Sequence, residues 1–133
     1  MKQLSTLFSK NGNPTISVGE GYYGNRGQTA TAYRDNTMTI WGAAFENYYT
    51  LAFTMFHEGT HAYFNLMGLS TKWDKDYFDC GSDVNEYNAY RLGFEIAPDI
   101  FSPNIFIYND SMNGNYYGNG NMNHWQAVFN LFK

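Results

Sequence analysis

The stretch from Glu46 to Met67 constrains the fold of this chain more than any other part of the sequence. It contains no proline and a single glycine, Gly59, so nothing in it ends a helix. Apolar residues occur at almost every angle around such a helix, which predicts a helix buried in the middle of a domain. These apolar residues include Phe53, Met55, Phe56, Ala62, Phe64, Leu66 and Met67.

Within this predicted helix, His57, Glu58 and His61 form the pattern H-E-x-x-H. At about 100° per residue, two histidines four positions apart are separated by about 40°, so both imidazoles can reach one ion. Glu58 lies about 100° from His57, where it flanks the ion without being forced to bind it. This arrangement is typical of zinc hydrolases, in which two histidines bind Zn2+ and a glutamate takes a proton from the metal-bound water.

The competing interpretation is that these are two packed core histidines, because a pattern of three fixed residues also occurs by chance. We favour the metal site for two reasons. Two histidines and a glutamate in an apolar environment are costly without a compensating partner, and a candidate third ligand follows. A metzincin would have glycine at position 64 and histidine at position 67, so Phe64 and Met67 exclude that class.

The candidate third ligand is Glu86, in a second predicted helix from Asp83 to Ile96. Gly81-Ser82-Asp83 is a strong helix start, and Pro98 ends the helix. Small residues on or near the same face as Glu86 would let this helix approach the first one closely. They are Ala89, Gly93 and Ala97.

Glu86 also has a purely structural interpretation, because Asp83-Val84-Asn85-Glu86 matches a capping box that would only satisfy the start of the helix. Its rivals as the third ligand are Glu95, nearly half a turn round the same helix, and His124, far along the chain. Neither rival fits the spacing as well as Glu86 does.

H-E-x-x-H at 57–61 followed by N-E-x-x-A at 85–89 resembles the gluzincin metallopeptidases, whose third zinc ligand is a glutamate of a second helix. The E-x-x-A part is similar to the lethal-factor and Pro-Pro endopeptidase group and to compact toxin-associated zincin domains. The resemblance covers residues 37–95 at most. It implies a zinc ion held by His57, His61 and Glu86, with Glu58 as the catalytic base.

The resemblance also implies a tyrosine that stabilises the oxyanion, placed in the loop shortly before the ligand glutamate. Tyr77 lies in that loop, two residues further from Glu86 than the pattern suggests, and His124 is the runner-up. The thermolysin-type pattern has aspartate four residues after the glutamate, where this chain has Tyr90. Asp83 is the candidate substitute for that carboxylate.

Before the helix, the sequence predicts a small sheet. We expect a short strand at Thr15–Val18 and a hairpin across residues 29–45 with Arg34-Asp35-Asn36 at its turn. The resemblance implies that the strand at 37–45 is the edge that pairs with an extended substrate peptide. The expected fold is α+β and zincin-like: a small twisted sheet packed on the central H-E-x-x-H helix and on the following helix that carries Glu86. We further expect a terminal helix from His124, capped by Asn123.

Length and charge limit the remaining possibilities. A chain of 133 residues predicts one domain spanning residues 1–133. A net charge of −4, with eight scattered Lys and Arg, argues against nucleic-acid or membrane binding. No apolar stretch reaches the roughly 20 residues of a membrane span, and the N-terminus does not match a signal peptide. The single cysteine, Cys80, cannot form an internal disulfide.

We therefore expect a zinc metalloendopeptidase that hydrolyses peptide bonds in peptide or protein substrates. One alternative is an effector or toxin domain of a longer secreted or surface protein, with the same chemistry. Another is a non-catalytic binding domain that keeps the fold, which the presence of Glu58 disfavours. The sequence indicates neither the cellular location, nor the oligomeric state, nor the residues preferred around the scissile bond.

Overall fold

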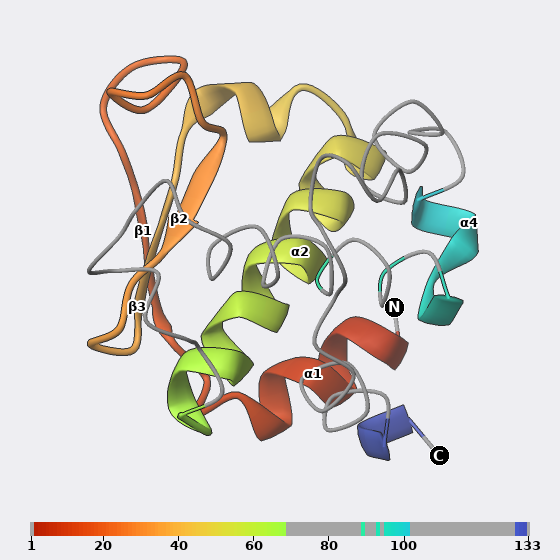
Figure 1. Cartoon of the computed structure of the whole chain (residues 1–133). Coiled ribbons are helices and arrows are strands. Elements are labelled where there is room, and N and C mark those ends of the chain that lie inside the picture. The colour runs from red at the N-terminus through yellow and green to blue at the C-terminus, as the bar shows by residue number, and fades with distance from the viewer. Residues whose placement is uncertain (1, 69–88, 90–92, 94, 102–129, 133) are drawn as a thin grey trace, which may run out of the picture.

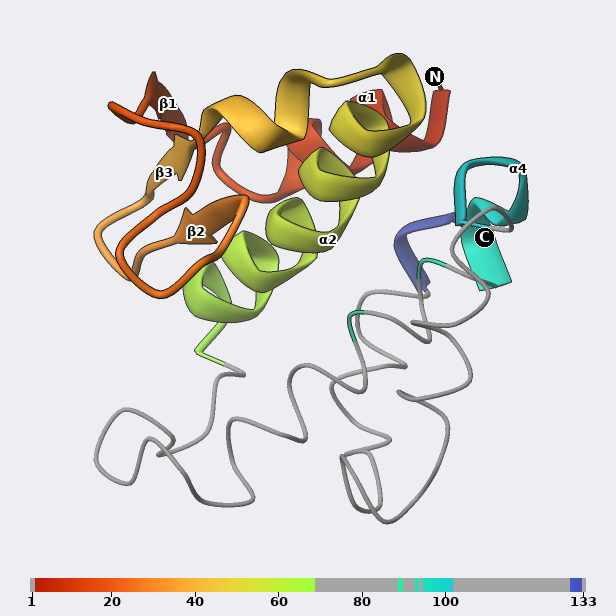
Figure 2. The ribbon, with the colours of Figure 1, turned by 90° about the horizontal axis from the view of Figure 1, so that it is seen from above.

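The predicted central helix forms, and the other elements lie around it (Figure 1). The computed structural model describes residues 2–68, 89, 93, 95–101 and 130–132. Helix α2 (Tyr48–Leu66) has the sheet on one side and the short helix α4 (Pro98–Phe101) on the other, as the view from above shows (Figure 2). The described part of the chain is therefore a small α+β fold, as expected.

Both ends of α2 have clear capping chemistry. The side chain of Asn47 accepts a hydrogen bond of 2.9 Å from the backbone N–H of Thr50, which satisfies one of the unpaired donors of the first turn. After the last turn, Gly68 has a φ of 68°, which a glycine adopts without steric cost. The helix predicted over residues 46–67 is confirmed, with its boundaries moved inward by one or two residues.

Three short strands form a mixed sheet in the order β1-β3-β2. Strand β1 (Thr15–Val18) runs parallel to β3 (Thr37–Ile40), with Thr15 opposite Thr37. Strand β2 (Ala30–Ala32) runs antiparallel to β3, with Ala32 opposite Met38. The predicted strand at residues 15–18 is confirmed.

The hairpin between β2 and β3 is also confirmed, with Arg34-Asp35-Asn36 in its turn. Asn36 has a φ of 64°, a left-handed conformation that asparagine tolerates better than most residues. The carboxylate of Asp35 accepts a hydrogen bond of 3.2 Å from the backbone N–H of Thr37, so this turn is stabilised by its own side chain.

The predicted role of residues 37–45 as the edge strand is wrong. β3 ends at Ile40 and lies in the centre of the sheet, between β1 and β2. Residues Gly42–Phe45 form a 3-10 helix, η1. The alternating pattern in the sequence correctly marks one covered face, because Met38 and Ile40 are buried. It does not show how many neighbours a strand has, and the parallel partner β1 is distant in sequence.

A helix that the sequence analysis did not identify, α1 (Lys2–Lys10), packs across α2. Its contact side carries Leu4, Leu7 and Phe8 at helical spacing, and Leu7 is completely buried. The close approach depends on Gly59, inside the H-E-x-x-H pattern. A Cβ atom at position 59 would lie 2.7 Å from the ring of Phe8 and 3.0 Å from Leu7 Cδ2.

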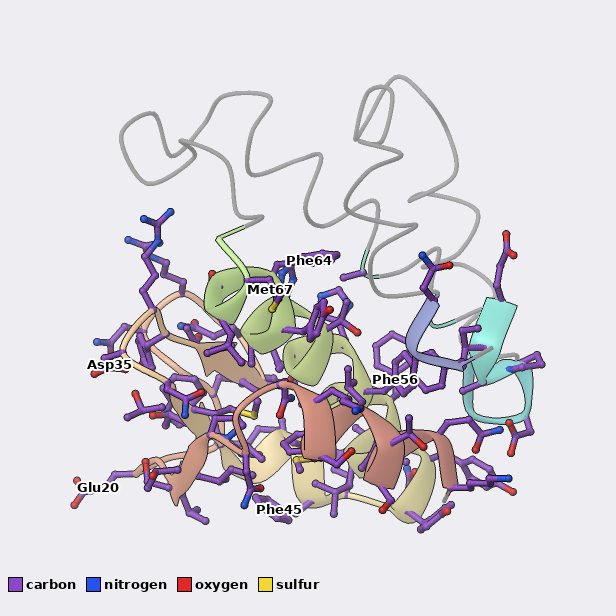
Figure 3. All side chains as sticks on the ribbon, turned by 90° about the horizontal axis from the view of Figure 1, so that it is seen from below. Glu20, Asp35, Phe45, Phe56, Phe64 and Met67 are labelled. Atoms are coloured by element: carbon purple, nitrogen blue, oxygen red, sulfur yellow. The ribbon has the colours of Figure 1, made fainter. Side chains whose placement is uncertain are left out.

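Side chains on both sides of α2 form the hydrophobic core, as predicted for a helix that is apolar all round. One cluster joins α2 to α1 and to the region before α4, and the other joins α2 to the sheet. Phe56 points from α2 toward the 3-10 helix η4 (Asn130–Phe132), where the ring of Phe132 lies 6.1 Å away (Figure 3). The buried members on the sheet side are Ala30, Met38, Ile40, Ala44 and Ala62.

The second predicted helix is described only toward its end. Ala89, Gly93, Glu95 and Ile96 are helical, and the backbone N–H of Ala97 donates a hydrogen bond of 2.9 Å to the carbonyl of Gly93. The small residues at 89, 93 and 97 are all buried. Pro98 ends this helical stretch as expected and begins α4, a position that proline favours. Most of the predicted helix from His124 lies outside the described residues.

Candidate metal centre

His57 and His61 point their Nε2 atoms toward each other from one face of α2. These two atoms lie 3.2 Å apart, the ring centroids are 4.8 Å apart and the ring planes meet at 84°. His57 is buried and His61 is half-buried. The sequence predicted that both imidazoles would share a face, and the helix places them so.

The separation of the two nitrogens fits one shared cation. Two ligand atoms bound at 2.0–2.1 Å to a tetrahedral zinc ion are about 3.3 Å apart. The same 3.2 Å also fits a hydrogen bond between a protonated and an unprotonated Nε2. The two states differ in their protons: a shared cation needs both Nε2 atoms unprotonated, whereas a hydrogen bond needs a proton on one of them.

Two phenylalanine rings lie near the histidine pair. The ring of Phe53 is parallel to that of His57, with an interplanar angle of 2° and centroids 6.2 Å apart. The ring of Phe64 lies 6.3 Å from that of His61, nearly perpendicular to it. Burial of His57 beside these rings lowers the local dielectric constant, which strengthens any electrostatic interaction made there.

Glu58 is anchored to the sheet. Its Oε2 accepts a hydrogen bond of 3.0 Å from the backbone N–H of Ala32 in β2. The side chain is half-buried. The carboxylate is therefore beside the histidine-bearing face of α2, but it is held by the sheet and does not join the histidines in a three-residue ligand cluster.

The remaining predicted site residues fall mostly outside the described part of the chain. This applies to Glu86, Tyr77, Asp83 and His124, and also to Cys80 and Tyr90. Glu95 is described and its side chain is exposed. Among the described residues, no three His, Cys, Asp or Glu side chains come close enough to hold a metal. The structure thus describes two of the three predicted ligands, His57 and His61, and the predicted base.

The donor set fits a zinc ion as far as it is described. Zinc favours imidazole nitrogen, and two ligands at i and i+4 on one helix are a common source of such nitrogens. A catalytic site needs a third protein ligand and one open position. The two histidines would supply two of the four positions, and no third ligand is found among the described residues.

Sequence reasoning missed two contacts that support this helix. One is the Ala32 N–H, which as a backbone group leaves no signal in the sequence. The other is Asn11, a completely buried residue whose Nδ2 donates a hydrogen bond of 3.1 Å to the carbonyl oxygen of Gly59. Asn11 stands in the turn-rich stretch after α1, and nothing in that stretch indicates a contact 48 positions away.

A hollow of about 460 Å3 lies on another side of α2, between its first half, α1 and β1. Tyr48 and Met55 line it, and at about 100° per residue both face away from His57 and His61. Among the residues that the structure describes, no histidine or carboxylate lines this hollow. The chemistry of the described residues is concentrated at the histidine pair.

Comparison of this chain with protein-family models, curated proteins and solved structures finds no match. The geometry of the site is therefore the basis for a functional assignment. Three features carry it: the converging imidazoles of His57 and His61, the anchored carboxylate of Glu58, and a central helix enclosed on both sides.

Proposed function

We propose that this chain is a zinc-dependent metallopeptidase domain in which His57 and His61 hold the metal and Glu58 is the general base. The observation that carries the proposal is the 3.2 Å separation of the two Nε2 atoms on a central helix. The anchored Glu58, one residue from the first histidine, supports it. The gluzincin-like pattern in the sequence supplies the class of reaction, which is amide hydrolysis.

Zinc held in such a site would polarise the substrate carbonyl and lower the pKa of a water molecule to about 7. Glu58 would accept a proton from the attacking water at its carboxylate and then deliver that proton to the leaving amine nitrogen. His57 and His61 would carry their remaining protons on Nδ1, because Nε2 faces the cation. The hydrogen bond from Ala32 would keep the carboxylate in one orientation during both proton transfers.

Glu86 remains the proposed third ligand, and Tyr77 the proposed hydrogen-bond donor to the oxyanion. Support for both comes from the spacing in the sequence. The small residues at positions 89, 93 and 97 also support Glu86, because they share its predicted helix face and are buried. The exposed side chain of Glu95 makes that glutamate a poor rival.

The substrate strand is reassigned from residues 37–45 to β2. Among the described strands, β2 is the edge strand that contacts α2, and its Ala32 touches the proposed base. An extended peptide that pairs with a sheet edge at this point would bring its backbone beside the site. Ala30 is buried and Ala32 is half-buried, so the accessible part of this edge is the end nearest the hairpin turn.

The proposal is compatible with a domain of a longer effector or toxin protein, because the chemistry would be the same. A non-catalytic binding domain would differ from the proposed metallopeptidase in binding metal without cleaving peptides. A histidine pair joined only by a hydrogen bond would differ from it in taking up no metal.

A peptide-library cleavage assay tests the proposal. The chain, loaded with zinc, should cleave a set of library peptides at defined bonds. Glu58→Gln should lower the rate by about 100-fold or more while the variant still binds zinc, because an amide cannot accept the proton. Glu95→Gln is the matched control, an exposed glutamate that should leave the rate unchanged. No cleavage by the native chain, or equal cleavage by Glu58→Gln, would overturn the mechanism.

A further inference from the structure

The backbone of β2 presents one set of its hydrogen-bonding groups away from the sheet. Tyr33 N–H donates to the carbonyl of Thr37, and the carbonyl of Thr29 accepts from Trp41 N–H. Antiparallel pairing alternates along a strand, so the odd-numbered residues of this segment face β3. Ala30 and Ala32 therefore direct their N–H and carbonyl groups to the other side.

One of these outward groups has a side-chain partner from α2. The N–H of Ala32 donates to Oε2 of Glu58 at 3.0 Å, across 26 positions of sequence. A charged acceptor makes this bond stronger than a neutral one, and both groups are at least partly shielded from water. The bond links the sheet directly to the residue between the two histidines.

This contact matters because a glutamate beside a metal site has two competing roles. A carboxylate binds zinc well, and if Glu58 did so it would take the position that a substrate or water must occupy. A glutamate has several rotatable bonds, so the sequence alone does not keep it out of the ligand set. The hydrogen bond to the sheet keeps the Glu58 carboxylate away from that coordination position.

We propose that the backbone N–H of Ala32 is a positioning group that holds the Glu58 carboxylate against β2, out of the coordination shell of a cation on His57 and His61. This proposal rests on the proposed metal site. It adds that the edge strand determines whether Glu58 is a base or a ligand. Ala32 is not a catalytic residue, because it acts only through Glu58.

Ala32→Pro tests the proposal, because it removes the N–H and leaves the pairing with β3 intact. Proline is tolerated on an edge strand where its nitrogen does not face a neighbouring strand. Ala32→Ser is the matched control, which changes the side chain and keeps the N–H. Two readouts are compared: kcat and KM for a library-derived peptide, and the visible absorption of the protein loaded with Co2+, whose intensity falls as the coordination number rises.

In Ala32→Pro, kcat should fall about tenfold or more, because the base is misplaced. The Co2+ absorption should weaken as Glu58 joins the ligands. Adding Glu58→Gln to Ala32→Pro should give the same spectrum as Glu58→Gln alone. Ala32→Ser keeps the N–H, so it should lose less kcat than Ala32→Pro and keep the native Co2+ absorption. A native spectrum and native kcat in Ala32→Pro, or an equal loss in Ala32→Ser, would overturn the proposal.

If Ala32→Pro does not fold, replacing Ala32 with lactic acid exchanges the N–H for an ester oxygen and keeps the alanine side chain, and the same outcomes apply. The hydrogen bond itself is tested on the metal-free chain by amide exchange. Glu58→Ala should speed exchange at Ala32 about tenfold or more relative to its β2 neighbours, and unchanged exchange would refute the contact. A native chain that takes up no Co2+ but shows this exchange effect would refute the proposed function while keeping the contact.

Discussion

The Nε2 atoms of His57 and His61 lie 3.2 Å apart, and the backbone of β2 holds Glu58, which stands between the two histidines in the sequence. Each histidine comes from the same face of α2, so the separation is fixed by one turn of helix. The two cores on either side of α2 keep that helix in place. A rigid helix is a precise support for a metal site, because its side chains need little reorganisation to bind.

Zinc should stabilise the chain, and acid should remove this effect. At free zinc 100 times its dissociation constant, the free energy of unfolding should rise by about 2.7 kcal/mol. The gain should disappear as the pH is lowered, because protonated imidazoles do not bind a cation. Urea unfolding with and without zinc, at several pH values, measures this. An increase in stability that persists in acid, or none at neutral pH, would contradict a site made of histidines.

If Glu86 is the third ligand, as proposed, Glu86→Ala should weaken zinc binding by more than the 10- to 100-fold typical of losing an outer-shell contact, because it removes one of three protein ligands. Titration of zinc against a competing chelator measures this. If Glu86 were only a helix cap, the change would cost about 1 kcal/mol of stability and leave zinc affinity unaltered. Glu95→Ala, an exposed glutamate further along the predicted helix, is the control and should do neither.

Gly59→Ala should destabilise the fold although alanine is the better helix former. The gain in helix propensity is about 1 kcal/mol, but the added Cβ would lie 2.7 Å from the ring of Phe8 and 3.0 Å from Leu7, which is completely buried. Overpacking of this kind costs about 1–3 kcal/mol, so we expect a net loss in urea unfolding. Combining it with Phe8→Leu should recover part of the loss. A more stable Gly59→Ala would show that α1 does not pack at this point.

Asn11→Ala should lower the free energy of unfolding by about 1–3 kcal/mol, because it removes a buried donor to the Gly59 carbonyl. The Oδ1 of Asn11 also accepts a hydrogen bond of 3.2 Å from the N–H of Asn13, which the change leaves unpaired. Ser9→Ala, at an exposed hydroxyl of α1, is the control and should change stability by less than about 0.5 kcal/mol. Equal effects of the two changes would mean that Asn11 does not support α2.

The sequence was sufficient to predict those elements that are determined by residues close to them in the chain. The limits of α2 follow from Asn47 and Gly68, and the turn of the hairpin follows from Asp35 and Asn36. The shared face of His57 and His61 follows from helix geometry alone. The prediction that the two imidazoles would lie together was therefore correct.

Features that depend on contacts distant in sequence were not predictable. Nothing near residues 37–40 indicates that β1 pairs with β3 in parallel, so β3 was mistaken for an edge. Helix α1 was missed although Leu4, Leu7 and Phe8 stand at helical spacing, because a helix of 9 residues depends on packing against α2 for its stability. The Ala32–Glu58 contact joins a backbone N–H to a side chain on another element, which no periodicity reveals.

The most direct test of the account is a zinc competition titration of the native chain and of His61→Ala. His61 is half-buried on α2 and alanine is the best helix former, so this variant should keep the fold. We expect about one tightly bound zinc per native chain and an affinity at least 100-fold lower in His61→Ala. No zinc bound by the native chain, or the same affinity in both proteins, would show that the two converging imidazoles are not a metal site.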